Sequence, residues 1–256
     1  MFRYIEPVYE KNMILTAEVL QEHTDYAHNL VKNAYIDYSD GIISGVNIEI
    51  TDAYIKVYPG LIKHNQVLYC LKKTVSVPYE HNGELTFLRI RFLDPIEQEG
   101  GILYETEIVL TNDHTEFLYE MELGRFIASP GATLYKTTSA FSQLALQYDQ
   151  FDIRFVNYAA VGVPTVSPVV TTLFARELLA KHTNEVYDIV FAMQCMSGQV
   201  VARDVILAYI QAKTGKKIEG LTNEQIYKEL EQIIKQPVAT GRFQNREHLA
   251  RRVIVD

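Results

Sequence analysis

One stretch decides the fold class: Gly41-Ile-Ile-Ser-Gly-Val-Asn-Ile-Glu-Ile50, followed after a turn by Tyr54-Ile-Lys-Val-Tyr-Pro-Gly-Leu-Ile-Lys-His-Asn-Gln-Val-Leu-Tyr69. Its side chains alternate, because Val46, Ile48 and Ile50 are apolar and the residues between them are polar. Ile55 and Val57 repeat the pattern. Successive side chains of a strand point to opposite faces, so the alternation predicts half-buried β-strands.

Turn-forming residues separate these predicted strands. Thr51-Asp52-Ala53 makes the first turn, Pro59-Gly60 interrupts the chain, and Asn65-Gln66 is a hairpin turn before Val67. None of these residues is typical of a catalytic site. The stretch therefore predicts a small all-β platform, and we interpret its glycines, Pro59 and Asn65 as turn residues that fix a scaffold.

A helix is predicted immediately before the platform, within an N-terminal lead and helix at residues 1–39. Thr16 is a good N-cap, and Asp40-Gly41 provides a C-terminal stop. An apolar stripe predicts about six turns of helix, and it consists of Val19, Tyr26, Leu30, Ala34 and Tyr38. We expect the stripe to pack against the chain's own sheet; its near-heptad spacing leaves self-association as a second interpretation.

More strands are predicted after the platform, at about residues 74–78, 85–93, 102–110 and 120–128. Asn82-Gly83 is a hairpin signal between the first two of them. Short strands with regular turn signals are typical of a small antiparallel β-sandwich or open barrel. We therefore predict a β platform domain at residues 40–160.

Residues 161–237 predict a helical domain. Pro168 suits a first helical turn, and Thr222 with Gln225 forms a capping box for the last helix. Between them we expect a helix over about 185–196, with Val186, Ile189, Val190 and Met193 inward, and another over about 199–213. Amphipathic helices joined by short loops are typical of an antiparallel bundle. The predicted class is therefore α+β.

Residues 238–256 form a basic C-terminal segment, with Arg242, Arg246, Arg251 and Arg252 ahead of an apolar end. Two interpretations stand side by side. The segment is an arm that docks onto a neighbouring subunit, or it is a terminus that frays or packs on its own chain.

Composition excludes several classes of protein. The chain has 256 residues and a formal net charge of −8, which disfavours nucleic-acid binding through a general basic surface. Two cysteines cannot build a disulfide framework. We expect no signal peptide and no membrane span. The 17 tyrosines suit β surfaces or protein interfaces, since tyrosine combines a large contact area with a polar tip.

No motif in the sequence predicts chemistry. Cys195 lies in an apolar helical pattern without a His or acid partner, so we expect a buried structural thiol. His23 and His28 fall on different faces of one helix, which disfavours a shared metal.

Carboxylates cluster at Asp94, Glu97, Glu99, Glu105, Glu107, Asp113 and Glu116. Glu105 and Glu107 share a predicted strand face, which suits glycoside chemistry or calcium, but a solvated strand face is the favoured interpretation. The sequence thus predicts no catalytic, cofactor-binding or metal residues, no cofactor and no enzyme.

A resemblance to a known family covers about residues 15–127. Asp40-Gly-Ile-Ile-Ser-Gly, then Val57-Tyr-Pro-Gly, and later Glu122-Leu-Gly-Arg-Phe-Ile resemble a pattern of baseplate and tail-fibre-associated proteins of tailed phages and phage-tail-like particles. That family has a helix before the pattern and short strands after it. Asn65 stands where the pattern has a glycine, a mild departure because Asn also adopts left-handed backbone.

The resemblance implies a structural subunit of a contractile tail, in a prophage or a bacteriocin-like particle. It implies assembly in the cytoplasm, then a place in the virion or particle baseplate. Its partners would be other baseplate or tail-fibre proteins, in a homo-oligomer or a hetero-oligomeric assembly, with no nucleic acid and no membrane. Two alternatives stay open: a carbohydrate- or cell-surface-binding β module, and a hydrolase with a carboxylate site between Asp94 and Glu116.

Overall fold

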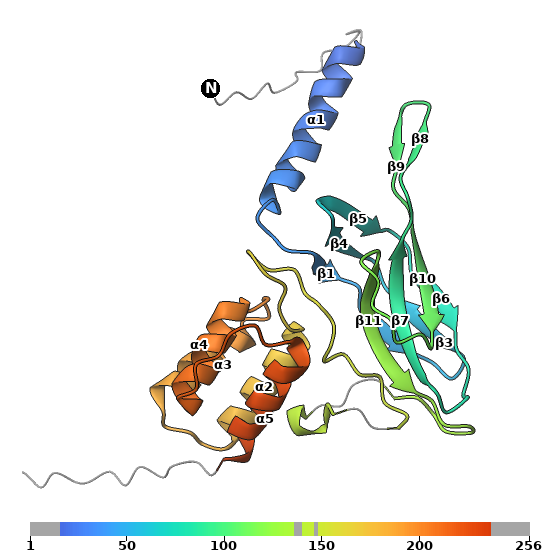
Figure 1. The fold of residues 1–256 in the computed structure, drawn as a ribbon. Coiled ribbons are helices and arrows are strands. Elements are labelled where there is room, and N and C mark those ends of the chain that lie inside the picture. Colours follow the sequence, from blue (N-terminus) through green and yellow to red (C-terminus); the bar gives the residue numbers. More distant parts are fainter. Residues whose placement is uncertain (1–15, 136–139, 146–147, 237–256) are drawn as a thin grey trace, which may run out of the picture.

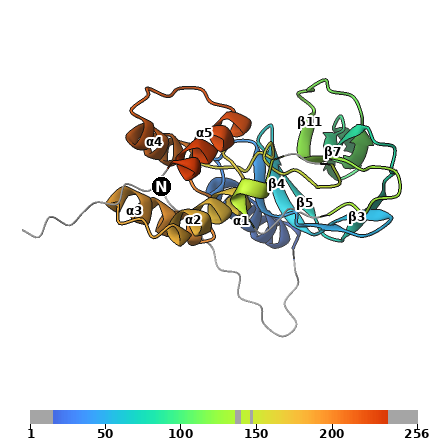
Figure 2. The same ribbon diagram turned by 90° about the horizontal axis from the view of Figure 1, so that it is seen from below.

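The computed structural model describes residues 16–135, 140–145 and 148–236, so the predicted arm at 238–256 lies outside the described residues. The predicted α+β class is confirmed, because one helix is followed by a run of strands and then by a group of helices (Figures 1 and 2). Each of the two parts, the run of strands and the group of helices, has a hydrophobic core of its own. One lies among the sheets, and the other joins Phe141 and Leu144 to the C-terminal helices.

Helix α1 (Ala17–Ala34) begins where the sequence predicts, but its end and the packing of its apolar stripe differ from the predictions. The side chain of Thr16 accepts the Val19 amide as an N-cap. The helix ends at Ala34, earlier than predicted, because residues after it turn toward the sheet; Gly41 is the first residue of β1 (Gly41–Gly45) and not a helix cap. The stripe does not pack against the chain's own sheet, since α1 projects from the β part with Leu20 and Leu30 at least half exposed (Figure 1).

The deciding stretch divides between two antiparallel sheets. The first has the order β1-β4-β5, with β4 at Gly60–His64 and β5 at Val67–Leu71. The second has the order β2-β3-β6, with β2 at Ile48–Ile50, β3 at Tyr54–Val57 and β6 at Val75–Pro78. The sequence predicts the strands but not this division, because the choice of partner depends on distant residues.

Two local predictions within the stretch are confirmed by its geometry, but Val46 lies between β1 and β2 with a φ of 53° and not in the predicted strand. Ile48 pairs with Val57 and Ile50 with Ile55, which puts the alternating apolar side chains on one face. Asn65 and Gln66 have φ values of 47° and 67°, the left-handed backbone of a tight hairpin turn.

Gly60 does more than break the chain. It pairs with Gly45, and a Cβ there would lie 2.6 Å from the carbonyl oxygen of Ser44. Two strands approach at this point so closely that a side chain has no room.

The third sheet has the order β10-β7-β11, with bounds of Thr106–Thr111, Leu85–Phe92 and Glu120–Ile127. The turn at Asn82-Gly83 exists, with φ +76° at the glycine, but it does not make a hairpin. It carries the chain from β6 in one sheet to β7 in another. A turn signal fixes the local reversal of the chain and not which strands pair.

The strand predicted over 102–110 is interrupted. Strands β8 (Ile96–Gln98) and β9 (Gly101–Leu103) form a hairpin of their own, and the chain leaves the ladder at Tyr104 and Glu105 before β10. This hairpin extends away from the sheets in the same direction as α1 (Figure 1).

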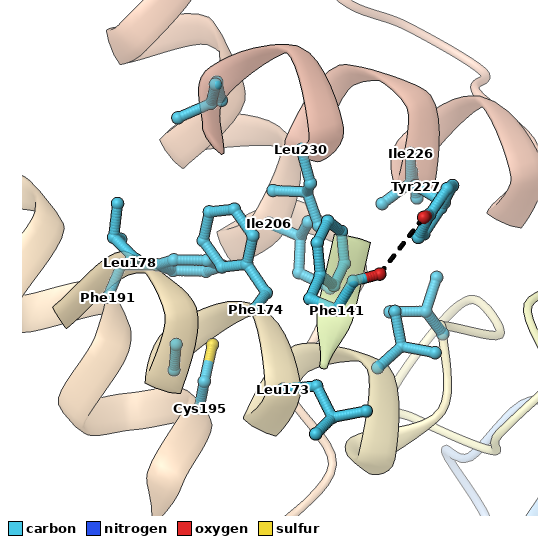
Figure 3. Packing of buried hydrophobic residues seen from close by; sticks show 14 of the residues in the cluster. Phe141, Leu173, Phe174, Leu178, Phe191, Cys195, Ile206, Ile226, Tyr227 and Leu230 are labelled. Carbon is cyan, nitrogen blue, oxygen red and sulfur yellow. Dashed lines mark hydrogen bonds between the residues drawn. The ribbon is translucent and has the colours of Figure 1, made fainter. Parts of the chain in front are cut away.

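The helical part contains a short 3-10 turn at Phe141–Gln143 and helices α2 (Pro168–Ala180), α3 (Val186–Met196), α4 (Arg203–Thr214) and α5 (Asn223–Lys235). Pro168 stands in the first turn of α2, and the predicted capping box at Thr222 and Gln225 is present. Aromatic rings fill the centre of this core, and the hydroxyl of Tyr227 donates to the carbonyl of Phe141 at 3.2 Å (Figure 3).

The prediction for the inner face of α3 was wrong. The buried residues of α3 are Asp188, Phe191, Ala192 and Cys195, whereas the four predicted inward residues all lie on the opposite side. This helix is apolar on nearly every face, so no stripe in its sequence marks the side that meets the core. Helix α4 begins later than expected, because Val201 lies in the connection before it and is buried there.

A polar seam fixes the helical part to the β part. The side-chain amide of Asn223, at the start of α5, donates to the carbonyl of Val156 at 3.0 Å. Within the helical part, Arg203 donates to the carbonyls of Pro164 and Leu221 and to the side chain of Asn223, which holds that side chain in place. The buried Asn223 amide thereby joins the start of α5 to the segment that follows the sheets.

Candidate functional site

The acidic residues singled out in the sequence do not form a site. Glu105 and Glu107 are both exposed, and Glu105 lies outside the strand that was expected to align them. Asp113 accepts the backbone N–H of Thr115 at 2.8 Å, and this hydrogen bond lowers the pKa of its carboxyl. Among the described residues no group of three or more His, Cys, Asp or Glu side chains has a geometry that could hold a metal ion.

Cys195 is a buried thiol, as predicted. Burial raises its pKa to about 12, and it faces the core formed by Phe174 and its neighbours (Figure 3). A thiol with so high a pKa is a poor nucleophile at neutral pH, because only the thiolate attacks. Cys70, in contrast, is exposed on β5.

The buried ion pair between Arg89 and Glu120 was not predicted from the sequence. Arg89 of β7 alternates with Leu88 and Ile90 along the strand, so the sequence pattern marks its face as the polar one, yet Arg89 is 4% exposed. Its guanidinium donates to Glu120 at 3.0 Å and to the carbonyls of Asp113 and Thr115, so it holds the β10–β11 loop against the sheet. Only the register of β7 with β11 brings the two charges together, and that register is not visible in the sequence.

The outer face of α3 is apolar, and the residues that the structure describes leave it uncovered. Its side chains are 49–71% exposed at Val186, Tyr187, Val190, Met193 and Met196. On a helix surface, positions three and four apart are neighbours, so these residues form one continuous strip, called here the α3 face. Fully burying one such side chain contributes roughly 1.5–3 kcal/mol, so the α3 face, as the described residues leave it, offers a large driving force for association.

The C-terminal end of α1 is anchored, although the described part of the chain does not cover the helix. The ammonium of Lys63, on β4, donates to the carbonyls of Tyr35, Ile36 and Tyr38 at 2.6–3.0 Å. A cation at the C-terminal end of a helix is favourable, because the helix dipole is negative at that end. The anchor fixes the direction in which α1 leaves the sheet.

A second anchor lies one residue along β4. Asp40 accepts the Asn65 amide at 3.1 Å and lies 3.5 Å from His64, whose imidazole stacks on Phe92. Burial lowers the pKa of His64, so the ring is neutral at physiological pH.

An open groove of about 720 Å³ follows β5, with the C-terminal half of α1 on one side and Tyr104 and β10 on the other; it is called here the β5 groove. Its lining is mainly apolar, and it includes Val31, Leu61, Leu68, Tyr69, Tyr104 and Ile108. The charged residues in the lining are Lys32 and Lys72, and no Asp or Glu lines the described groove. In the described part of the chain, β5 pairs with β4 alone, so its other edge is free along this groove.

No protein-family model matches the chain, and no curated protein matches it. Among solved structures, a crystal structure of TssK is 9% identical with a TM-score of 0.40, over 89% of this chain and 69% of that one. A chain of the type VI secretion system TssK-TssF-TssG baseplate subcomplex is 11% identical with a TM-score of 0.43, over 91% and 98%. A chain of the baseplate complex from the type VI secretion system is 9% identical with a TM-score of 0.37, over 91% and 100%.

No helix in the described part of the chain is long and apolar enough to span a membrane.

Proposed function

We propose that the chain is a structural subunit of a contractile-tail-like baseplate, which joins neighbouring wedge subunits or a tail fibre through protein–protein interfaces. It acts by binding and not by catalysis, in a homo-oligomer or a hetero-oligomeric assembly. It assembles in the cytoplasm and ends in the particle. The sequence resemblance at residues 40–65 and 122–127 names the kind of assembly.

The α3 face is the observation that carries the proposal. Five large apolar side chains lie side by side in solvent, on a helix whose other side is packed in a core. Tyrosine and methionine are enriched at protein interfaces, and the unbranched methionine side chain adapts to a partner's surface. A contiguous apolar patch on a folded chain marks an interaction surface rather than a chance exposure.

Helix α1 supports the same conclusion independently. Most of the stability of a helix in a protein comes from packing its apolar face against a neighbour, and the described residues do not cover that face of α1. Here the base of the helix is fixed by Lys63, while Leu20, Tyr26, Leu30 and Val31 are 45–58% exposed. A helix presented in this way is completed by a neighbouring subunit.

Co-expression with the other baseplate proteins tests the proposal. We expect the full chain to sediment with them as one complex and to be visible in particles by electron microscopy. The double substitution Val190→Asp and Met193→Asp places charges on the α3 face and should remove the chain from the complex. Because both positions are exposed, the thermal unfolding of the isolated chain should change little.

The matched control is Lys228→Asp, on the outer, charged face of α5. It changes charge on a helix of the same core and should leave assembly intact. A wild-type chain that remains a stable monomer in the presence of every tail protein would overturn the proposal.

A further inference from the structure

The free edge of β5 offers a second interaction surface of a different kind. Its five residues, Val67–Leu71, are all apolar or cysteine, with no charge until Lys72. Edge strands are normally protected by charges, prolines, bulges or a covering element, because their unpaired N–H and C=O groups invite another strand. β5 has none of these along its free edge in the described chain, apart from the β5 groove itself.

The two faces of β5 meet different surroundings within the groove. Tyr69 points toward the sheet core, where its ring lies 5.0 Å from Phe92 and 6.3 Å from Tyr104. Leu68 and Cys70 alternate with it and lie on the face of Lys63, which carries the anchor of α1. A strand added to this edge would therefore place every second side chain in the apolar groove beside Tyr69, and the side chains between them next to Leu68 and the exposed Cys70.

The charged residues that line the β5 groove indicate what kind of segment binds there. The chain carries a net charge of −8, yet the charged residues that line the groove are Lys32 and Lys72, with His28 beside them. Lys32 and Lys72 are exposed, and neither has an ion-pair partner in the described chain. An apolar groove with a positive rim complements a segment that is apolar in the middle and acidic at its ends.

We propose that the β5 groove binds an extended, acidic-ended apolar segment of a partner subunit, which adds to the free edge of β5 as a strand. Because β5 has five residues, the segment spans roughly 15–17 Å, or four to six residues. Main-chain hydrogen bonds supply affinity, and the apolar groove beside Tyr69 with its lysine rim supplies selectivity. The inference rests on the proposed function, since it describes how one neighbour is held.

Cys70 provides a native reporter for the test. It is exposed and lines the groove, whereas Cys195 is fully buried, so a thiol reagent modifies Cys70 first in the folded chain. The probe is a synthetic peptide, Glu-Val-Thr-Val-Thr-Val-Glu, capped at both ends. At ten times its dissociation constant it should slow the modification of Cys70 about tenfold.

Two peptide controls separate strand addition from general stickiness. The peptide Lys-Val-Thr-Val-Thr-Val-Lys should protect Cys70 at least about fivefold less well, because its charges meet the lysine rim. The peptide Glu-Val-Thr-Pro-Thr-Val-Glu should not protect, since proline donates no hydrogen bond to the ladder. In the protein, Lys72→Glu should reverse the charge preference, and Lys217→Glu, at an exposed position in the helical part, should leave it unchanged.

Three results would overturn the proposal. The first is no protection at millimolar peptide. The second is Cys70 that is already slow in the full chain and becomes fast when residues 1–15 are deleted, which would assign the groove to the chain's own N-terminal segment. The third is protection that grows with protein concentration alone, which would assign the edge to a second copy. The assay uses the isolated chain, so its failure is distinguishable from failure of the co-sedimentation experiment on the α3 face.

Discussion

Helices α3 and α5 belong to one hydrophobic core and treat their outer faces in opposite ways. α5 buries Ile226, Leu230 and Ile233 and turns Glu–Lys pairs four residues apart toward solvent. α3 buries Phe191 and Cys195 and turns valine, tyrosine and methionine toward solvent. Both helices are equally part of the folded chain, so the exposed apolar face of α3 is not a requirement of the fold.

The difference separates residues that hold the structure from residues that present a surface. A charged outer face adds a few tenths of a kcal/mol per pair and keeps a helix soluble. An apolar outer face adds nothing to the isolated chain and raises its tendency to associate. A partner is therefore the best explanation of the α3 face. The following predictions test whether its side chains contribute to the stability of the isolated chain.

The largest expected effect is on the inner face of α5. Leu230→Ala removes a fully buried side chain and should lower the free energy of unfolding by about 2–5 kcal/mol, because it leaves a cavity. Met193→Ala on the α3 face should change it by less than about 0.5 kcal/mol. Urea denaturation of both variants measures the contrast. Equal losses would break the comparison, since they would mean that the α3 face is packed in the isolated chain.

The next effect concerns the polar contact that orients α3. Asp188 is buried and accepts hydrogen bonds from Thr183 at 2.8 Å and Tyr209 at 2.9 Å, with the Lys213 ammonium 3.0 Å away. Asp188→Ala leaves these donors unsatisfied and should cost about 1–3 kcal/mol of unfolding free energy. Lys228→Ala breaks an exposed pair on α5 and should cost no more than about 0.5 kcal/mol. If the two losses are similar, Asp188 is not what fixes the rotation of α3.

The smallest effect is a pH dependence on the inner face of α3. Burial raises the pKa of Cys195 from 9.0 to about 12. Between these values the unfolded chain has lost the thiol proton and the folded chain retains it, so stability is complete below pH 9 and falls as the pH rises above it. The expected slope is at most about 1.4 kcal/mol per pH unit.

Cys195→Ala removes this titration and should flatten the decline between pH 9 and 10.5, measured as the difference in slope from the wild type. The constant loss of packing cancels in that difference. Identical slopes in the two proteins would mean that water reaches the inner face of α3.

Sequence reasoning succeeded where the signal is contained in a few neighbouring residues. The cap at Thr16, the capping box at Thr222 and the left-handed turn at Asn65 all depend on hydrogen bonds or backbone preferences within one turn. The α+β class followed from the change of hydrophobic period along the chain. The groove and the α3 face were not predicted, because the sequence of α3 is apolar on nearly every side and β5 looks like any half-buried strand.

Some wrong predictions share one physical cause. Asn82-Gly83 turns the chain but does not pair β6 with β7, and the stripe on α1 does not meet the chain's own sheet. Pairing and coverage depend on which distant segments are available, and no local pattern records them.

Local sequence therefore specifies where this chain is helix, where it is strand and where it turns, since those choices are made by interactions a few residues apart. Tertiary packing alone decides which face of α3 is hidden, that Arg89 meets Glu120, and that β5 keeps a free edge beside two lysines. Those are contacts between segments far apart in the chain, and in this protein they are what leaves the two proposed interaction surfaces exposed.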